Sequence, residues 1–292
     1  MKDAVLEAIA YFDLTVVDIK PVAESYSSIV RILILENQET LILKIPFSGR
    51  KFSREKNVLQ RLQGQLPIPK TIDYRNPDDD RPGLFLLSFL PGNPIKGNIT
   101  PELAFKLGEL LAKLHSIRLD TFGDLFRADS VSTSDWWTFC DSAFQDRKPI
   151  CRQVIPQELF GKVLQKYDDL CADLPPPDGP CIVHNDYRPG NVLVQNCDVI
   201  GLIDFESTNS GSADRDFIKI KQEVWDVFPG TKHAFLKGYA SIRPVPNLEK
   251  TMPLYEFYNA FGGVAWCVIR NQTNTPFYFT HLNLLQRLVY TN

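Results

Sequence analysis

The chain has 292 residues, 44% of them hydrophobic and 23% charged, which is the composition of a folded globular protein and argues against a disordered chain. Its formal net charge of −3 offers no basic excess for binding nucleic acid or an anionic membrane. We therefore expect a small-molecule partner, with no nucleic acid and no membrane among the partners.

The N-terminus predicts a short amphipathic helix, because Val5, Ile9 and Phe12 recur at helical spacing. It lacks the charged-then-apolar layout of a signal peptide, and the longest apolar runs, such as residues 84–90, are too short to span a bilayer. Six scattered cysteines without close pairs fit reduced thiols better than a zinc site or a disulfide framework. These features predict a cytoplasmic protein.

The region from residue 14 to residue 90 predicts an antiparallel sheet, since short β-branched or aliphatic runs alternate with turn residues. The expected strands cover residues 15–19, 29–35, 40–45, 71–74 and 84–89. One helix lies among them. Its apolar positions run from Phe52 to Leu62, and Gly64 stands where a helix commonly ends.

The pattern becomes helical after Pro91-Gly92, which indicates a lobe boundary near residues 90–96. Thr100 is a candidate N-cap and Pro101 a favourable first helical residue, and leucines follow at helical spacing. Further along, three consecutive prolines form a stiff approach to an expected strand at residues 181–183.

A polar loop between two apolar strands carries the groups best suited to act on a substrate. It runs from His184 to Asn191, and a later apolar run ends at Asp204. Phosphoryl transfer from ATP requires a group that accepts the proton of the acceptor hydroxyl, and oxygen ligands for magnesium. Asp186 suits the first role, and Asn191 and Asp204 suit the second. Asp186 and Asn191 are separated by the spacing that protein kinases use between their base and their magnesium-binding Asn.

The motif HNDYRPGNVLV, followed by LIDFE, resembles the aminoglycoside phosphotransferase family, within the wider group of choline-kinase-like small-molecule kinases. The resemblance covers nearly the whole chain and implies an α+β, bilobal, protein-kinase-like fold with an N-terminal antiparallel sheet and one helix, and a larger, mainly helical C-terminal lobe. Residues 1–92 would form the nucleotide-binding lobe, and residues 93–292 the catalytic and acceptor-binding lobe.

The same resemblance implies an Mg²⁺-dependent kinase that transfers the γ-phosphate of ATP, with GTP as an alternative, to a hydroxyl of a small molecule. It implies Asp186 as the catalytic base, Asn191 and Asp204 as magnesium ligands, and His184 as a brace for the loop. Arg188 stands where protein kinases carry a lysine near the γ-phosphate, so we expect it to stabilise transition-state charge, with a solvated loop arginine as the alternative. The motifs do not identify the acceptor.

Lys44 is the expected contact of the ATP phosphates. Strand alternation places it on the same face as Ile42, flanked by apolar residues, where an ammonium group needs an anion. Glu55, on the predicted helix, is the acid expected to hold it. A solvated lysine on an edge strand is the alternative.

The segment that should cover the phosphates, residues 24–29, contains no glycine, unlike the protein-kinase loop and many family members. Ser27 or Ser28 is expected to supply a hydroxyl donor there. Adenine is expected to dock on backbone groups around Ser88 and Leu90. The missing glycine favours an alternative function, a nucleotide-binding pseudokinase or regulatory module without transfer activity, whereas the intact set of Lys44 and the loop residues argues against it.

The acceptor side gives less information. After Asp216, which we expect to hold the catalytic loop by hydrogen bonds, the chain carries only four acidic residues against eight lysines and arginines. That balance disfavours a polycationic aminoglycoside as substrate. Glu206 is expected either to lie near the metals or to contact the acceptor. A protein kinase is disfavoured because no glycine follows Phe205 and no Ala-Pro-Glu element is present.

Overall fold

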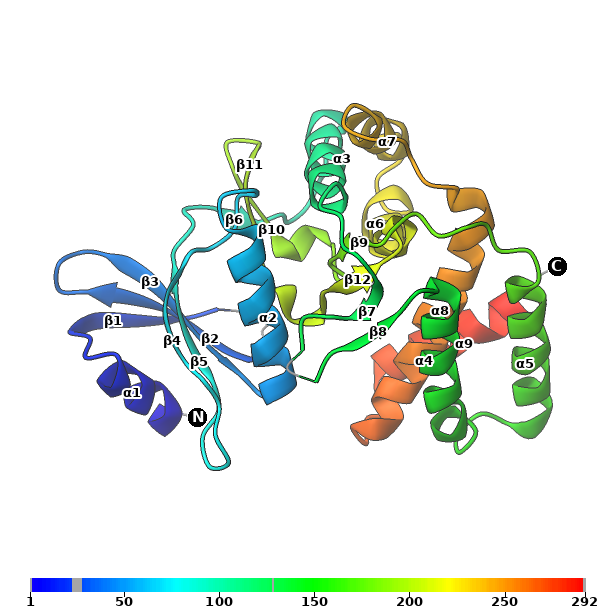
Figure 1. Ribbon diagram of the computed structural model, residues 1–292, viewed down its shortest axis with the longest axis horizontal. Coiled ribbons are helices and arrows are strands. Elements are labelled where there is room, and N and C mark those ends of the chain that lie inside the picture. The colour runs from blue at the N-terminus through cyan, green and yellow to red at the C-terminus, as the bar shows by residue number, and fades with distance from the viewer. Residues whose placement is uncertain (1, 23–27, 128, 291–292) are drawn as a thin grey trace.

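The computed structural model describes residues 2–22, 28–127 and 129–290. In Figure 1 a sheet built by the N-terminal part lies at one side, a group of helices lies at the other, and helix α2 (Gly49–Leu62) stands between them. This is the α+β, bilobal arrangement expected from the sequence.

The N-terminal sheet is antiparallel, with the strand order β1-β2-β3-β5-β4. Its strands are β1 (Val16–Pro21), β2 (Ser28–Leu35), β3 (Thr40–Pro46), β4 (Thr71–Arg75) and β5 (Leu84–Ser88). The strands agree with the sequence interpretation to within one or two residues, because alternating β-branched runs bounded by polar turns are a strong local signal.

Each face of this sheet is covered by one helix. Helix α1 (Lys2–Tyr11) packs Val5 and Ala8 against the outer face, together with Leu43 and other side chains of β2, β3 and β5. Helix α2 covers the inner face, where the ring of Phe52 stacks on that of Phe85 at 4.4 Å between centroids. The expected alternation along β3 is therefore observed, with Lys44 on the inner face.

The C-terminal part is mainly helical. Its helices are α3 (Pro101–His115), α4 (Trp136–Cys151), α5 (Gln157–Cys171), α6 (Phe217–Ile220), α7 (Thr231–Ala240), α8 (Leu248–Ile269) and α9 (Pro276–Tyr290). The predicted cap of α3 is present, since the Thr100 hydroxyl accepts the backbone N–H of Leu103 at 3.2 Å. A π-helical turn at Lys221–Trp225 follows α6.

Helices α3 and α7 cross at two glycines. A Cβ on Gly108 would lie 2.0 Å from the carbonyl oxygen of Phe235, and a Cβ on Gly238 would lie 2.0 Å from that of Phe105. Only glycine permits this close approach of the two backbones.

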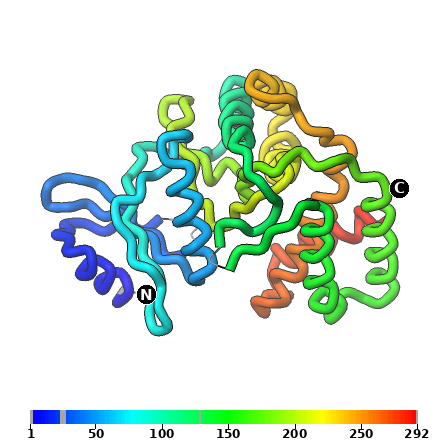
Figure 2. Tube along the Cα trace, viewed as in Figure 1, coloured from blue at the N-terminus to red at the C-terminus, as the bar shows by residue number. Residues whose placement is uncertain are grey.

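Two small sheets lie between the N-terminal sheet and the C-terminal helices. One has the order β11-β10-β6 and the other β8-β7-β12-β9. Their strands are β6 (Asn93–Pro94), β7 (Phe122–Asp124), β8 (Val131–Thr133), β9 (Cys181–Val183), β10 (Val192–Gln195), β11 (Asp198–Leu202) and β12 (Asn209–Gly211). In the tube of Figure 2, β10, β11 and β12 belong to the yellow-green part of the chain, which lies between the blue N-terminal sheet and the orange and red C-terminal helices.

Within the described residues, every helix is either too short or too polar to cross a membrane.

Candidate active site

The polar loop that follows β9 is anchored by hydrogen bonds to the Asp216 carboxylate. The backbone N–H groups of His184 and Asn185 donate to the Asp216 carboxylate at 2.7 and 2.6 Å, and His115 Nε2 lies 3.0 Å from the same carboxylate. Asn185 adopts a positive φ of 62°, which turns the chain so that both N–H groups point the same way. Burial alone would raise the pKa of Asp216, but the bond with His115 and the backbone donors hold it below its usual range. The anchor is therefore an ionised carboxylate.

Asp186 is positioned by two neighbours in the same loop. The Asn191 side-chain amide donates to both the backbone carbonyl and Oδ2 of Asp186, at 2.9 Å each, and Arg188 Nε donates to Oδ2 at 3.2 Å. The short 3₁₀ turn Pro189–Asn191 creates this geometry by folding Asn191 back over the loop. Among the described residues, none donates a hydrogen bond to Oδ1, so that oxygen is available to an acceptor hydroxyl.

Lys44 joins the N-terminal sheet to the segment after β11. Its ammonium lies 2.9 and 2.7 Å from the two carboxylate oxygens of Glu55, and 2.8 Å from Oδ1 of Asp204. Asp204 follows strand β11, whose last two residues are buried, and has a left-handed φ of 68°, which turns its side chain toward β3. The expected pair of Lys44 and Glu55 is thus present, and Asp204 completes it.

These three groups shift one another's pKa values. Burial would lower the pKa of Lys44, but the carboxylates of Asp204 and Glu55 raise it well above its ordinary value, so the ammonium stays protonated. Burial likewise opposes the charge on Asp204, yet Lys44 holds its pKa below the usual range. Burial raises the pKa of Glu55 to about 7; the Lys44 ammonium opposes this shift and the nearby Asp204 carboxylate adds to it.

Sequence reasoning missed two cations from the first half of α2. Lys51 Nζ donates to Glu206 Oε1 at 2.6 Å, and Arg54 donates to the Glu206 carbonyl at 2.7 Å while also pairing with Asp124. Glu206, left open by the sequence, is buried beside the Lys44 cluster, 3.9 Å from the Lys44 ammonium. The only sequence signal was that Lys51 and Arg54 share one turn of the helix that carries Glu55.

Three carboxylates gather where a divalent cation would be needed. One oxygen each of Glu55, Asp204 and Glu206 can be chosen so that all lie within 4.8 Å of one another. Carboxylate and amide oxygens are the donors that Mg²⁺ prefers, so this set fits the ion. Because Lys44 contacts both oxygens of Glu55 but only Oδ1 of Asp204, Asp204 is the better ligand of these two.

Asn191, the other expected ligand, is linked to this group through the backbone. The N–H of Ile203, just before Asp204, donates to the Asn191 carbonyl at 3.0 Å, and His184 Nε2 lies 3.0 Å from the Ile203 carbonyl. The Asn191 amide nitrogen is engaged by Asp186, which leaves its Oδ1 as the atom to contact a metal.

Four further residues were predicted to contact the nucleotide. Ser27 lies outside the described residues. Ser28 is buried at the start of β2, opposite Pro46 of β3. Ser88 ends β5, and its N–H donates to the Lys70 carbonyl while its hydroxyl accepts the Lys70 N–H. Leu90 therefore stays the better prediction for an adenine contact, in the segment that leads from β5 to β6.

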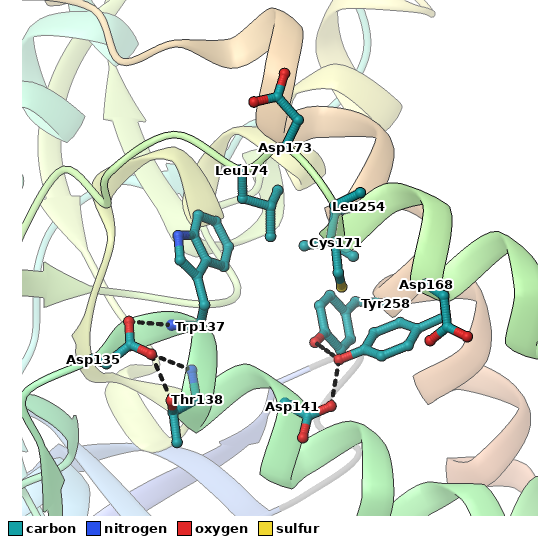
Figure 3. A pocket seen from close by; sticks show the side chains of 12 residues that line it. Asp135, Trp137, Thr138, Asp141, Asp168, Cys171, Asp173, Leu174, Leu254 and Tyr258 are labelled. Carbon is teal, nitrogen blue, oxygen red and sulfur yellow. Dashed lines mark hydrogen bonds between the residues drawn. The ribbon is translucent and has the colours of Figure 1, made fainter.

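A cavity of about 590 Å³ lies between α4, α5 and α8, and no residue of the segment 184–206 lines it. Several aspartates line it, and Figure 3 shows two of them hydrogen-bonded within the protein: Asp135 caps α4, and Asp141 accepts the hydroxyl of Tyr167. Asp173 pairs with Lys250. We assign this cavity no part in the chemistry.

Comparison with known proteins places these observations in context. A family model described as the phosphotransferase enzyme family matches residues 18–254. The homoserine kinase of Gluconobacter oxydans is 29% identical over 180 residues, which cover 59% of this chain. The match spans 54% of that enzyme, about half of its length.

Solved structures resemble the whole chain at low sequence identity. The macrolide 2'-phosphotransferase MphH of Brachybacterium faecium is 15% identical, with a TM-score of 0.69 and 99% of each chain covered. An aminoglycoside phosphotransferase, APH(4)-Ia, in a ternary complex with AMP-PNP and hygromycin B, is 15% identical, with a TM-score of 0.71 and 96% of each chain covered. These similarities show the fold.

Proposed function

The chain belongs to the phosphotransferase enzyme family, and from that premise we propose that it is a small-molecule kinase that transfers the γ-phosphate of ATP to an acceptor hydroxyl. GTP is the alternative donor, since the solved relatives include one bound to an ATP analogue and one bound to GDP. The homoserine kinase relative adds a hydroxyl amino acid to the acceptors that merit testing.

One observation carries the proposal. Lys44 and Asp204, which come from the two halves of the molecule, meet at 2.8 Å, next to a loop in which Asp186 is fixed by Asn191 at 2.9 Å. A cation for the phosphates, acids for a metal and a carboxylate for the hydroxyl proton are the three groups that phosphoryl transfer needs, and here they converge.

In the proposed reaction the acceptor hydroxyl donates its hydrogen bond to Asp186. Its oxygen attacks the γ-phosphorus, the bond between the γ-phosphorus and the bridging oxygen breaks, and the nucleoside diphosphate leaves. The hydroxyl proton passes to the Asp186 carboxylate, while Arg188 stabilises the charge that develops on the transferring group. Mg²⁺, held by Asp204 with Asn191 and Glu206, would neutralise phosphate charge.

The substitution Asp186→Ala tests this proposal. We expect acceptor-dependent release of ADP to fall by roughly 10²–10⁴-fold, because the general base is removed. The measurement is steady-state turnover with a panel of hydroxyl-bearing small molecules, and mass spectrometry identifies the phosphorylated product.

Asp198→Asn is the matched control, because Asp198 is an exposed acid on β11 that pairs with Lys106. We expect it to retain wild-type turnover. Undiminished turnover in Asp186→Ala would show that the assigned base is wrong. Magnesium-dependent nucleotide binding without transfer to any acceptor and without ATP hydrolysis would favour the pseudokinase alternative.

A further inference from the structure

A second cavity, of about 280 Å³, opens beside the catalytic loop. Asn185, the residue before Asp186, lies in its wall, and so does Ser207, the residue after Glu206. The cavity therefore borders the loop that carries Asp186, although the Asp186 side chain is not part of its wall. Its volume is near the lower end for small-molecule sites, which favours a compact acceptor over a multi-ring antibiotic.

The charge of this cavity has one sign. Arg54 of α2, Arg147 of α4 and Arg215 of the 3₁₀ turn Ala213–Asp216 all contribute to its wall, and no aspartate or glutamate does within the described part of the chain. A cationic acceptor entering here would meet three guanidinium groups, of which only Arg54 is paired with an acid, Asp124, so its binding would be penalised.

Two of the three arginines lack a protein counter-ion. Arg54 pairs with Asp124, but across residues 2–22, 28–127 and 129–290 neither Arg147 nor Arg215 has a carboxylate oxygen within 4.0 Å. Arg215 Nη1 is buried without a hydrogen-bond partner, and its guanidinium lies 5.3 Å from the ring centre of Tyr255.

The two unpaired guanidinium groups also repel each other. Burial lowers the pKa of Arg147, and the nearby Arg215 lowers it further. Asp214, the acid next to Arg215 in sequence, is 2% exposed, and burial raises its pKa, which favours its neutral form. Two partly buried cations held together without an anion form an arrangement that an anionic ligand would stabilise.

We propose that the acceptor carries an anionic oxyacid group, a carboxylate or a phosphate, in addition to its hydroxyl, and that Arg147 and Arg215 bind this group in the cavity that borders the catalytic loop. The inference rests on the proposed kinase function and adds a class of substrate to it. Guanidinium groups suit the task, because their planar donors match the paired oxygens of a carboxylate or phosphate.

A panel of matched acceptor pairs tests the inference on the full-length protein with Mg-ATP. Each pair joins a compound that carries the anionic group, called the anionic member, to an analogue without that group: 4-hydroxybutanoate with 4-hydroxybutanamide, L-homoserine with L-homoserine amide, and glycerol 3-phosphate with glycerol. Both members of the homoserine pair keep the amino group, so they differ only in the carboxylate. We expect the anionic member of at least one pair to be favoured in kcat/KM by about 10- to 100-fold, the range for one or two charge-assisted hydrogen bonds. The first two pairs report on carboxylate, and the third on phosphate.

Binding measured without transfer separates this inference from the function on which it rests. With AMP-PNP and Mg²⁺ present, the favoured anion is expected to raise the melting temperature more than its neutral partner does. Arg147→Gln and Arg215→Gln are each expected to weaken its binding at least 10-fold, while Lys162→Gln, a surface charge deletion on α5, leaves it unchanged. Arg147→Gln relieves the repulsion between the two cations, so it is expected to fold.

Each outcome bears on one of the two claims. Preference for the neutral or a cationic acceptor, no stabilisation by any anionic member, or anion binding that survives both arginine substitutions would overturn the inference. Anion binding that depends on the arginines, with no phosphorylated product, would support the inference and count against the kinase function instead.

Discussion

At the scale of single residues, the central feature is that one buried ammonium group interacts with three carboxylates. Lys44 is 6% exposed and contacts Glu55 and Asp204 directly, with Glu206 at 3.9 Å. A nucleotide phosphate that approached Lys44 would compete with Asp204 for it, and a divalent cation would compensate Asp204 for the loss. Lysine and metal would thus exchange partners when Mg-nucleotide binds.

The Asp216 anchor leads to a prediction about acid stability. Its pKa is depressed in the folded protein, so its contribution to stability is complete above the unfolded-state pKa of about 4 and is lost as the pH falls below that value. In Asp216→Asn we expect the free energy of unfolding at neutral pH to fall by about 1–3 kcal/mol, and its decline below pH ~4 to become shallower. Urea unfolding over a pH series measures both quantities.

If the free energy of unfolding of Asp216→Asn falls as steeply below pH ~4 as that of the wild type, other carboxylates dominate the loss of stability in acid. Asp198→Asn again provides the control, because that acid lies at the surface.

The residues of the loop were accessible from sequence because their spacing is local. Asp186 and Asn191 share one loop, and the pairing of Lys44 with Glu55 joins neighbouring elements of one sheet-and-helix unit. Arg147 and Arg215 were not accessible. They come from α4 and from the turn before α6, and only the packing of the C-terminal part brings them to one cavity.

At the scale of elements, the crossing of α3 and α7 is the contact least tolerant of change. We expect Gly108→Ala to destabilise the protein by about 1–3 kcal/mol or more, since the added methyl would lie 2.0 Å from the Phe235 carbonyl and the two helices would have to separate. Thermal and urea unfolding of the purified variant measure the change.

Gly161→Ala is the matched control, because Gly161 lies in α5 with no atom within 4 Å of the added Cβ. It is expected to stabilise the protein by about 0.5–1 kcal/mol through helix propensity. Equal effects of the two substitutions would show that α3 and α7 separate at little cost.

The elements also show where sequence reasoning stops. The five strands of the N-terminal sheet were predicted because each has enough residues for a visible alternation. The three-residue strands β7, β8 and β12 were not, because so short a segment has no periodicity and is defined only by its partners.

At the scale of the whole molecule, one hydrophobic core crosses between the two halves. Phe52, Phe85 and Leu87 of the N-terminal part belong to the same buried cluster as Leu107 and Phe217 of the C-terminal part. We propose residues 1–92 and 93–292 as the two lobes, and we expect them to unfold together because they share this core.

Scanning calorimetry tests that expectation. We expect a single endotherm whose calorimetric enthalpy agrees with the van't Hoff enthalpy, as for a two-state transition. Two resolved transitions, with the N-terminal sheet melting first, would show that the lobes are independent folding units.

Helix α2 carries adjacent residues that are expected to act on both substrates, the acceptor and the nucleotide. Arg54 lines the cavity beside the catalytic loop, and the next residue, Glu55, holds the lysine expected to bind phosphate. During evolution, a substitution of Arg54 that admitted a new acceptor would also disturb nucleotide binding. Substitutions of Arg147 or Arg215 would change the acceptor without that effect. In a library selected for phosphorylation of new acceptors, we expect sequencing to find positions 147 and 215 substituted far more often than position 54. Equal frequencies would show that changing Arg54 does not impair the use of nucleotide.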